Sequence, residues 1–251
     1  MVTYIFSGKV EPERASVSIS PLSIRIEAID AGFSGGAIVS INSSQVSIKL
    51  DTTSEGVSLA TMKNYVEQFV RATVDSYGYL SGRGYDVEIT SAIQPDGTQT
   101  VFGVGIPELE ESRHERPLSF QELLEAVGKS PYLHQALADL REAIRSPLDT
   151  GFFCYRAVEC LRQHFKKDED GDQDGPSWER LRQNLRIDLS WLNRMKDAAK
   201  EPRHGKFPYI SGTDSVEVMQ HAWRVVDRFC VYASKDFQAL PESDFDILRE
   251  V

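Results

Sequence analysis

The stretch PELEESRHERP, residues 107–117, separates two parts of the chain that follow different hydrophobic periods. It is charged, begins and ends with proline, and has almost no large apolar side chain. This composition is typical of an exposed connection between domains. We therefore predict an interdomain linker here, with an N-terminal domain over residues 1–106 and a C-terminal domain over residues 118–236.

The part before this stretch alternates apolar and polar residues in short runs rich in Val, Ile, Ser and Thr, which is the period of half-buried strands. Five such runs come first: VTYIFS (2–7), ASVSIS (15–20), LSIRIEA (22–28), GAIVSIN (36–42) and QVSIKL (45–50). Residues 58–78 then repeat apolar side chains at spacings of three and four behind a candidate N-cap, Ser58, and so predict a helix. Strand period returns in residues 85–93 and 100–106, joined through PDG, a hairpin signal. The N-terminal domain is thus expected to be α+β, a mainly antiparallel sheet covered by a helix on one face.

The part after the linker has helical period throughout. Six helices are expected, over residues 119–129, 132–146, 150–167, 177–186, 190–200 and 214–235. Ser119 with Glu122 and Asp214 with Glu217 have the spacing of capping boxes. Short connections favour antiparallel neighbours, so these helices predict an all-α bundle. The remaining residues, 237–251, are expected to be a loosely docked acidic tail.

The bulk composition excludes several classes of protein. The chain has 251 residues and a net charge of -10, an acidic balance that disfavours non-specific nucleic-acid binding by the whole chain. No apolar run is long enough for a membrane span, and the N-terminus lacks the pattern of a secretory signal. Three cysteines, few and odd in number, favour reduced thiols and a cytoplasmic location. No cofactor and no metal site are expected.

One window departs from the acidic balance. Between Arg180 and Lys206 there are eight basic residues and only three acids. A solvated helix face is the ordinary interpretation of such a cluster, and a surface for an anionic partner is the alternative. The candidate binding residues are Arg180, Arg194, Lys200, Arg203 and Lys206.

Other candidate motifs do not have the residue spacing or the place in the chain that their usual ligands require. DEDGDQDG, residues 168–175, resembles a calcium loop, but neither register places both the glycine at position 6 and the glutamate at position 12. We expect a polar loop between helices there. GFSGG (32–36) and SGRGYD (81–86) do not lie between a strand and a following helix, so they predict turns rather than dinucleotide-binding loops. No pair of histidines has the HExxH spacing of a zinc site.

The order of elements in the second part is more specific. A helix carrying YRAVECL is followed by a loop, two short helices, the basic stretch KEPRHGK and a long final helix. This order, together with His204–Gly205, resembles the HEPN superfamily of helical bundles over residues 150–235. The resemblance implies a prokaryotic defence or stress setting and a homodimer paired through the helices beside the histidine loop, near Trp191 and Trp223.

Catalytic HEPN proteins are metal-independent endoribonucleases, and the resemblance gives His204 the proton-transfer role, with Arg203 as the cation beside it. In that family an arginine stands four to six residues before the histidine, whereas this chain has Asp197, Ala198 and Ala199 around that position. We therefore expect a noncatalytic HEPN-like binding protein whose basic face takes RNA, a nucleotide phosphate or an acidic protein. A metal-independent endoribonuclease using His204 is the alternative.

Overall fold

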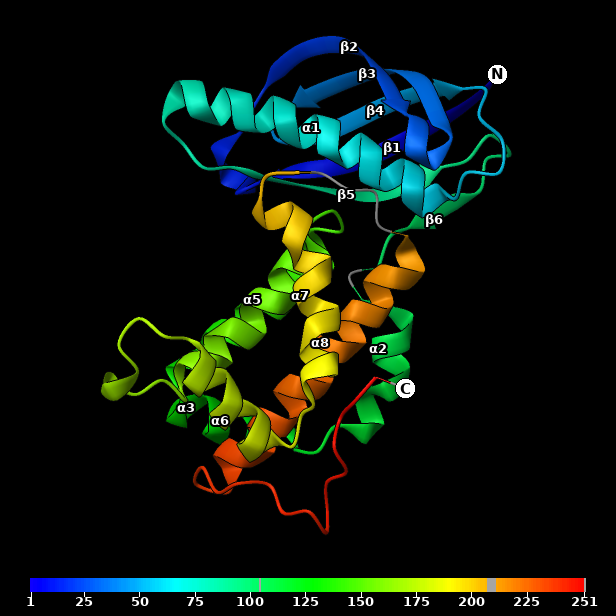
Figure 1. The fold of residues 1–251 in the computed structure, drawn as a ribbon. Helices are drawn as coiled ribbons and strands as arrows, with labels where there is room; N and C mark the ends of the chain where they lie inside the picture. The colour runs from blue at the N-terminus through cyan, green and yellow to red at the C-terminus, as the bar shows by residue number, and fades with distance from the viewer. Residues whose placement is uncertain (104, 207–210, 251) are drawn as a thin grey trace. The chain divides into compact units, whose positions relative to one another are not determined.

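The computed structural model describes residues 1–103, 105–206 and 211–250. The chain divides into two compact units, Met1–Gly103 and Val104–Val251. The first unit is an antiparallel sheet with one long helix, and the second is helical (Figure 1). This confirms the predicted fold class. Within the described residues no helix is long and apolar enough to cross a membrane.

The sheet of the first unit has six strands in the order β2-β3-β4-β1-β5-β6, and every neighbouring pair is antiparallel. The strands are β1 (Val2–Glu11), β2 (Ile19–Ala28), β3 (Phe33–Asn42), β4 (Gln45–Thr52), β5 (Asp86–Ile93) and β6 (Gln99–Val101). The earliest strand, β1, lies between β4 and β5. Because side chains alternate along each strand, one face of the sheet collects the apolar residues of the core.

Helix α1 (Leu59–Ser81) lies across that apolar face of the sheet (Figure 1). It buries Met62, Val66, Val70 and Val74 in the same core as the strands. These residues recur every three or four positions and so form one stripe of the helix. Ser58 caps the helix as predicted, because its side chain accepts a hydrogen bond from the backbone N–H of Thr61.

Two of the expected strands differ from the structure. The run at residues 15–20 does not form a strand of its own, because Val17 exchanges hydrogen bonds with Ser44 in the turn between β3 and β4. Its end instead continues into β2. The run at residues 100–106 yields only the end of the short strand β6, and Val104 lies outside the described residues.

The second unit begins with α2 (Pro107–Glu111) and a 3-10 turn, η3 (Ser112–Glu115). The longer helices follow: α3 (Phe120–Lys129), α4 (Pro131–Arg145), α5 (Thr150–Gln163), α6 (Gly175–Leu185), α7 (Leu189–Arg203) and α8 (Gly212–Ser234). The apolar stripe of α5, with Cys154, Val158 and Leu161, is fully buried in their shared core. The capping box of Ser119 and Glu122 at α3 is confirmed.

Three segments of the second unit differ from expectation: the linker, the start of α8 and the C-terminal tail. The expected linker forms α2 and η3, buries Leu109 in the helical core, and pairs Arg116 with Asp227 of α8 at 2.6 Å. Helix α8 begins earlier than predicted and takes Ser211 as its cap in place of Asp214, because the Ser211 hydroxyl accepts the Asp214 N–H.

The expected acidic tail is held against the bundle at several points. Leu240 is buried, and Leu248 forms a parallel bridge with Ile187. Arg228 donates hydrogen bonds to the backbone carbonyls of Leu185, Arg186 and Asp246. Its burial, with Arg186 nearby, lowers the pKa of Arg228 to about 10.

Candidate functional site

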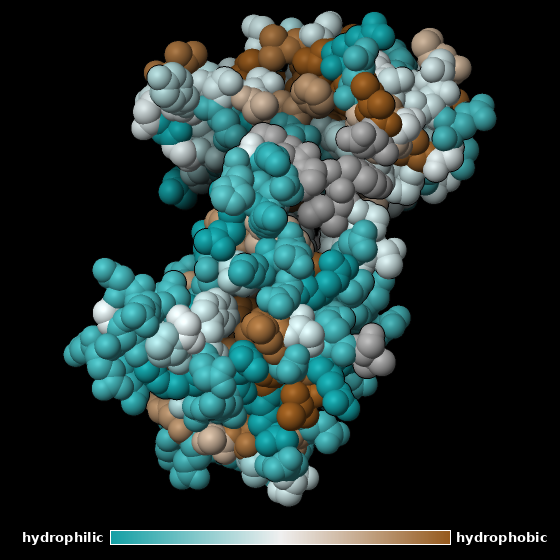
Figure 2. All heavy atoms as spheres, in the orientation of Figure 1, coloured by the Kyte–Doolittle hydropathy of each residue, from teal (hydrophilic) through white to brown (hydrophobic). Residues whose placement is uncertain are grey.

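The predicted histidine loop lies at the end of α7. One side of this helix is buried through Trp191, Leu192, Met195 and Ala199. Its opposite side exposes Lys196, Lys200 and Arg203, which recur at spacings of four and three and therefore share one helical face. Figure 2 shows that hydrophilic residues predominate on the side of the helical unit that it displays, with small hydrophobic groups between them.

Helix α7 packs closely on the start of α5, which fixes the position of this face. Gly151 of α5 lies so near the backbone of α7 that a Cβ atom would stand 2.7 Å from the carbonyl oxygen of Ala198. Only glycine permits this approach without a shift of one helix. Two of the positions around which the HEPN pattern has its arginine, Ala198 and Ala199, are thus part of the contact between helices.

Arg203 is held over α5 by a cation–π contact. Its guanidinium carbon lies 5.4 Å from the ring centre of Tyr155, which itself stacks on Trp178 at 6.0 Å. Arg162 covers Trp178, with 5.4 Å between its guanidinium carbon and the ring centre. The Arg203 side chain also faces Glu159 at 3.7 Å, and burial raises the pKa of that carboxyl group despite the nearby arginines. Arg203 is therefore positioned but still partly exposed, with room for a further anion.

His204 is the C-terminal cap of α7 and is exposed. Its backbone N–H donates to the carbonyl of Glu201 at 3.0 Å. Its imidazole makes no hydrogen bond or ion pair with any residue that the structure describes. Gly205 follows with φ of 72°, a left-handed turn, and residues 207–210 of the same loop lie outside the described residues. Glu201 is a carboxyl group near this ring: its bond to Lys206 is the main cause of its lowered pKa, and His204 contributes to the same shift.

The other predicted binding residues have internal partners. Arg180 donates to both carboxylate oxygens of Asp170 and to the carbonyl of Phe165. This arginine holds the pKa of Asp170 well below its usual range, at about 2. In the loop that resembles a calcium site, two of the acids are therefore paired with arginines: Asp170 with Arg180, and Asp174 with Arg162.

Arg194 and Lys206 are also engaged. Arg194 donates to Glu217 at 2.9 Å and lies 3.6 Å from Asp214, while Lys206 pairs with Glu201 at 2.6 Å. Of the five predicted residues, Lys200 and Arg203 therefore remain the ones best placed to meet an external anion. Lys196, which the prediction did not include, lies on the same face.

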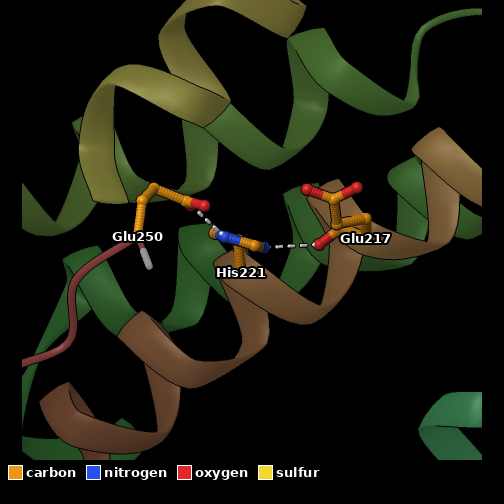
Figure 3. A group of neighbouring side chains, drawn as sticks. All are labelled: Glu217, His221 and Glu250. Carbon is orange, nitrogen blue, oxygen red and sulfur yellow. Dashed lines mark hydrogen bonds and ion pairs between the residues drawn. The ribbon is translucent and has the colours of Figure 1, made fainter. Parts of the chain in front are cut away.

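A second cluster was not predicted. Glu217 and His221 of α8 lie beside Glu250 of the C-terminal segment, and one potential ligand atom from each lies within 4.8 Å of the others (Figure 3). His221 is buried, and its ring stacks on Trp191 with 3.9 Å between the ring centres. The i, i+4 spacing of Glu217 and His221 was visible in the sequence, but nothing in it places Glu250, 29 residues further on, against them.

The two tryptophans expected near the histidine loop belong to the bundle, and Trp191 lies in the first turn of α7, at the other end of this helix from His204. Trp191 is buried and donates its indole N–H to the carbonyl of His221 at 3.3 Å. Trp223 is partly buried against the same core. Packing within one chain therefore accounts for both side chains, and the expected two-fold pairing rests on the resemblance alone.

Comparison with known protein families divides the chain at the same place as the structure. The N-terminal domain of DUF8168, a domain of unknown function, matches residues 4–102, and the C-terminal domain of DUF8168 matches residues 120–234. The chain belongs to the DUF8168 family. The two DUF8168 matches fall within the two compact units, and the expected linker lies between them. No curated protein and no solved structure matches the chain.

Proposed function

We propose that this chain is a noncatalytic HEPN-like binding protein that contacts the phosphates of single-stranded RNA through the exposed face of α7. The observation that supports the proposal is that Arg203 is held in place but has no strong ion pair. Its guanidinium is held over Tyr155, and its contact with Glu159 is long, at 3.7 Å. An ion pair of this kind is worth little at a surface, so a phosphate can compete for the arginine.

Lys196 and Lys200 extend the same face by two turns toward the start of α7. Neither lysine has an ion pair among the described residues. Lysine and arginine along one helix face can follow successive phosphates of a single strand without reading its bases. Acidic residues elsewhere in the chain then restrict binding to this face, since the net charge of the molecule is -10.

The test is fluorescence anisotropy with a labelled single-stranded RNA of about 20 nucleotides over a range of salt concentrations. The double variant Lys200→Glu/Arg203→Glu should bind at least about 10-fold more weakly. The dependence of log affinity on log salt should become shallower by about 1.4, since each phosphate contact on a single strand contributes about 0.7. The matched control is Lys129→Glu/Arg141→Glu, which reverses two exposed charges on α3 and α4 and should change neither quantity.

Equal losses in the two double variants would contradict the proposal, because they would reflect net charge alone. Wild-type protein that binds no RNA would also contradict it, and capture of an acidic protein by the same α7 face would then replace RNA as the partner.

A second function, a metal-independent endoribonuclease, is favoured by one observation only: His204 is exposed directly beside Arg203. Wild type and His204→Ala should be compared on RNA in EDTA. Under the binding proposal the two proteins give equal background. Cleavage that requires His204 and leaves 2′,3′-cyclic phosphate ends would establish the enzyme instead.

A further inference from the structure

We propose that Glu217, His221 and Glu250 bind a first-row divalent metal ion of the zinc class, and that the ion fastens the C-terminal segment to α8. This inference does not depend on the proposed phosphate contacts. Glu217 and His221 lie one turn apart on α8, and Glu250 reaches them from the C-terminal segment (Figure 3). One imidazole with carboxylates is a nitrogen and oxygen ligand set that suits zinc and its neighbours.

The imidazole is already oriented as a ligand. Nδ1 of His221 lies 2.8 Å from the backbone carbonyl oxygen of Glu217. A carbonyl oxygen only accepts hydrogen bonds, so Nδ1 carries a hydrogen and Nε2 is the atom turned toward Glu250. Metal-binding histidines characteristically use one ring nitrogen in this way to fix the other. Stacking on Trp191 holds the plane of the ring as well.

The contact between His221 and Glu250 is a close one. Nε2 and Oε1 of Glu250 lie 2.5 Å apart, and both are acceptors when the ring hydrogen is on Nδ1. A metal ion could take the place of the hydrogen that otherwise joins the two atoms, provided that they move apart. A tetrahedral zinc ion with bonds of about 2.0–2.1 Å needs its ligand atoms about 3.3 Å apart. Withdrawal of Glu250 by about 1 Å would suffice, and its side chain is 38% exposed.

The Glu217 carboxylate is oriented as a second carboxylate ligand by its hydrogen bond with Arg194. Its Oε1 accepts a hydrogen bond from Nε of Arg194 at 2.9 Å, which orients the carboxylate and directs a metal to Oε2. Asp214 also lies near that guanidinium, at 3.6 Å, and offsets its charge. The Glu217 side chain is 42% exposed, so water can complete the coordination and an ion can enter from solvent.

The position of Glu250 is set independently of any ion. Its backbone N–H donates to the hydroxyl of Ser190 at 3.2 Å, and the hydroxyl in turn donates to Asp188 at the start of α7. The C-terminal segment thus reaches the two α8 ligands without the metal, and the metal would join two elements that already meet. Binding of the ion should therefore slow local opening of the segment more than it changes the rest of the bundle.

The experiment uses the full chain, treated with EDTA and then desalted. Isothermal titration with Zn²⁺ should show one site, and Co²⁺ in its place should develop visible absorption from nitrogen and oxygen ligands. Glu250→Gln and His221→Gln should each weaken Zn²⁺ binding by at least about 10-fold. Hydrogen exchange of residues 245–250 should slow when Zn²⁺ is added to wild type and not when it is added to Glu250→Gln.

His134→Gln is the matched control, since His134 is exposed on α4 and lies outside the cluster, and it should bind Zn²⁺ as wild type does. Glu250→Gln covers the case in which His221→Gln fails to fold, because Glu250 is exposed and its loss leaves the core intact. Absence of Zn²⁺ binding, or equal binding by wild type and Glu250→Gln, would overturn the proposal and leave a hydrogen bond between His221 and Glu250.

Discussion

His204 and His221 belong to the same helical bundle but differ in the exposure of their rings and in the partners of those rings. His204 is exposed at the end of α7, where its ring makes no hydrogen bond or ion pair with a described residue. His221 is buried, stacked on Trp191, and hydrogen-bonded through both ring nitrogens. The sequence singles out His204–Gly205 as a motif, whereas His221 falls within a predicted helix and belongs to no motif. A local motif indicates where chemistry is possible, but only the fold supplies the partners that a side chain needs for it.

The largest expected effect is a difference in the free energy of unfolding between the alanine variants of the two histidines. His221→Ala removes a buried ring, its stacking on Trp191 and the partner of Glu250, and it should lower the free energy of unfolding by about 2–4 kcal/mol. His204→Ala removes an exposed side chain and should change it by less than about 0.5 kcal/mol. Urea unfolding followed by circular dichroism measures both. Equal losses would contradict the exposed position of His204.

The next effect tests whether Arg180 is a structural residue rather than a binding residue. Asp170 has a pKa of about 2 in the folded chain because Arg180 and a backbone N–H stabilise its charged form, and its ordinary value is 3.8. A lowered pKa adds stability that is complete above the ordinary value and lost as the pH falls toward about 2.

Asp170→Asn should therefore be less stable than wild type at pH 7, and the difference should shrink between about pH 4 and pH 2. Thermal unfolding of the two proteins across that range measures the difference. A difference that stays constant down to pH 2 would contradict the ion pair with Arg180.

A smaller effect concerns the start of α8, the helix that carries His221. Ser211→Ala removes the side chain that caps the helix and should cost about 1 kcal/mol of stability. Asp214→Ala removes the carboxylate that accepts from the Ser211 hydroxyl at 2.7 Å and lies 3.6 Å from Arg194. It should cost less, because the Ser211 hydroxyl can still accept the backbone N–H of residue 214 and so still caps the helix. Chemical unfolding of the two variants decides which residue is the cap, and a larger loss in Asp214→Ala would restore the capping box predicted from the sequence.

The smallest effect compares two arginines in RNA binding. Arg203→Gln should weaken binding a few-fold and reduce the salt dependence by about 0.7, the contribution of one phosphate on a single strand. Arg180→Gln should leave the salt dependence unchanged, because Arg180 is already bonded to Asp170. Anisotropy titrations at three salt concentrations distinguish the two, and the reverse order would move the binding surface from α7 to α6.

The sequence predicted the elements that depend on local pattern. The stripes of α1 and α5 and the cap at Ser58 follow from spacing and side-chain chemistry alone, and the structure confirms them. Val17 shows the limit: its alternating neighbours have strand period, yet its backbone bonds to Ser44 in a distant turn. Patterns along the chain report which side chains are buried, but they do not report which backbone partner satisfies each N–H.

The same limit applies to the candidate site. A cluster of basic residues was readable between Arg180 and Lys206, but the acids that engage them were not. Asp170, Glu217 and Glu159 reach their arginines from other helices or loops, and these pairings depend on how the helices pack. Glu250 could not be placed beside His221 for the same reason. The sequence could place the candidate binding face on about one helix, while the basic residues of that face without internal partners could be identified only from the fold.

The central position of β1 has a consequence for synthesis of the chain. This strand emerges first, yet its neighbours are β4 and β5, which end at Thr52 and Ile93. At about 5–20 residues per second, the ribosome needs roughly 4–16 s after β1 to deliver both partners. Both edges of β1 are unpaired until β4 is complete, and the edge that meets β5 stays unpaired for the whole interval. The same strand has an apolar face with Phe6 and Val10. Nascent chains released or stalled before β5 are therefore the species most exposed to aggregation and to capture by chaperones.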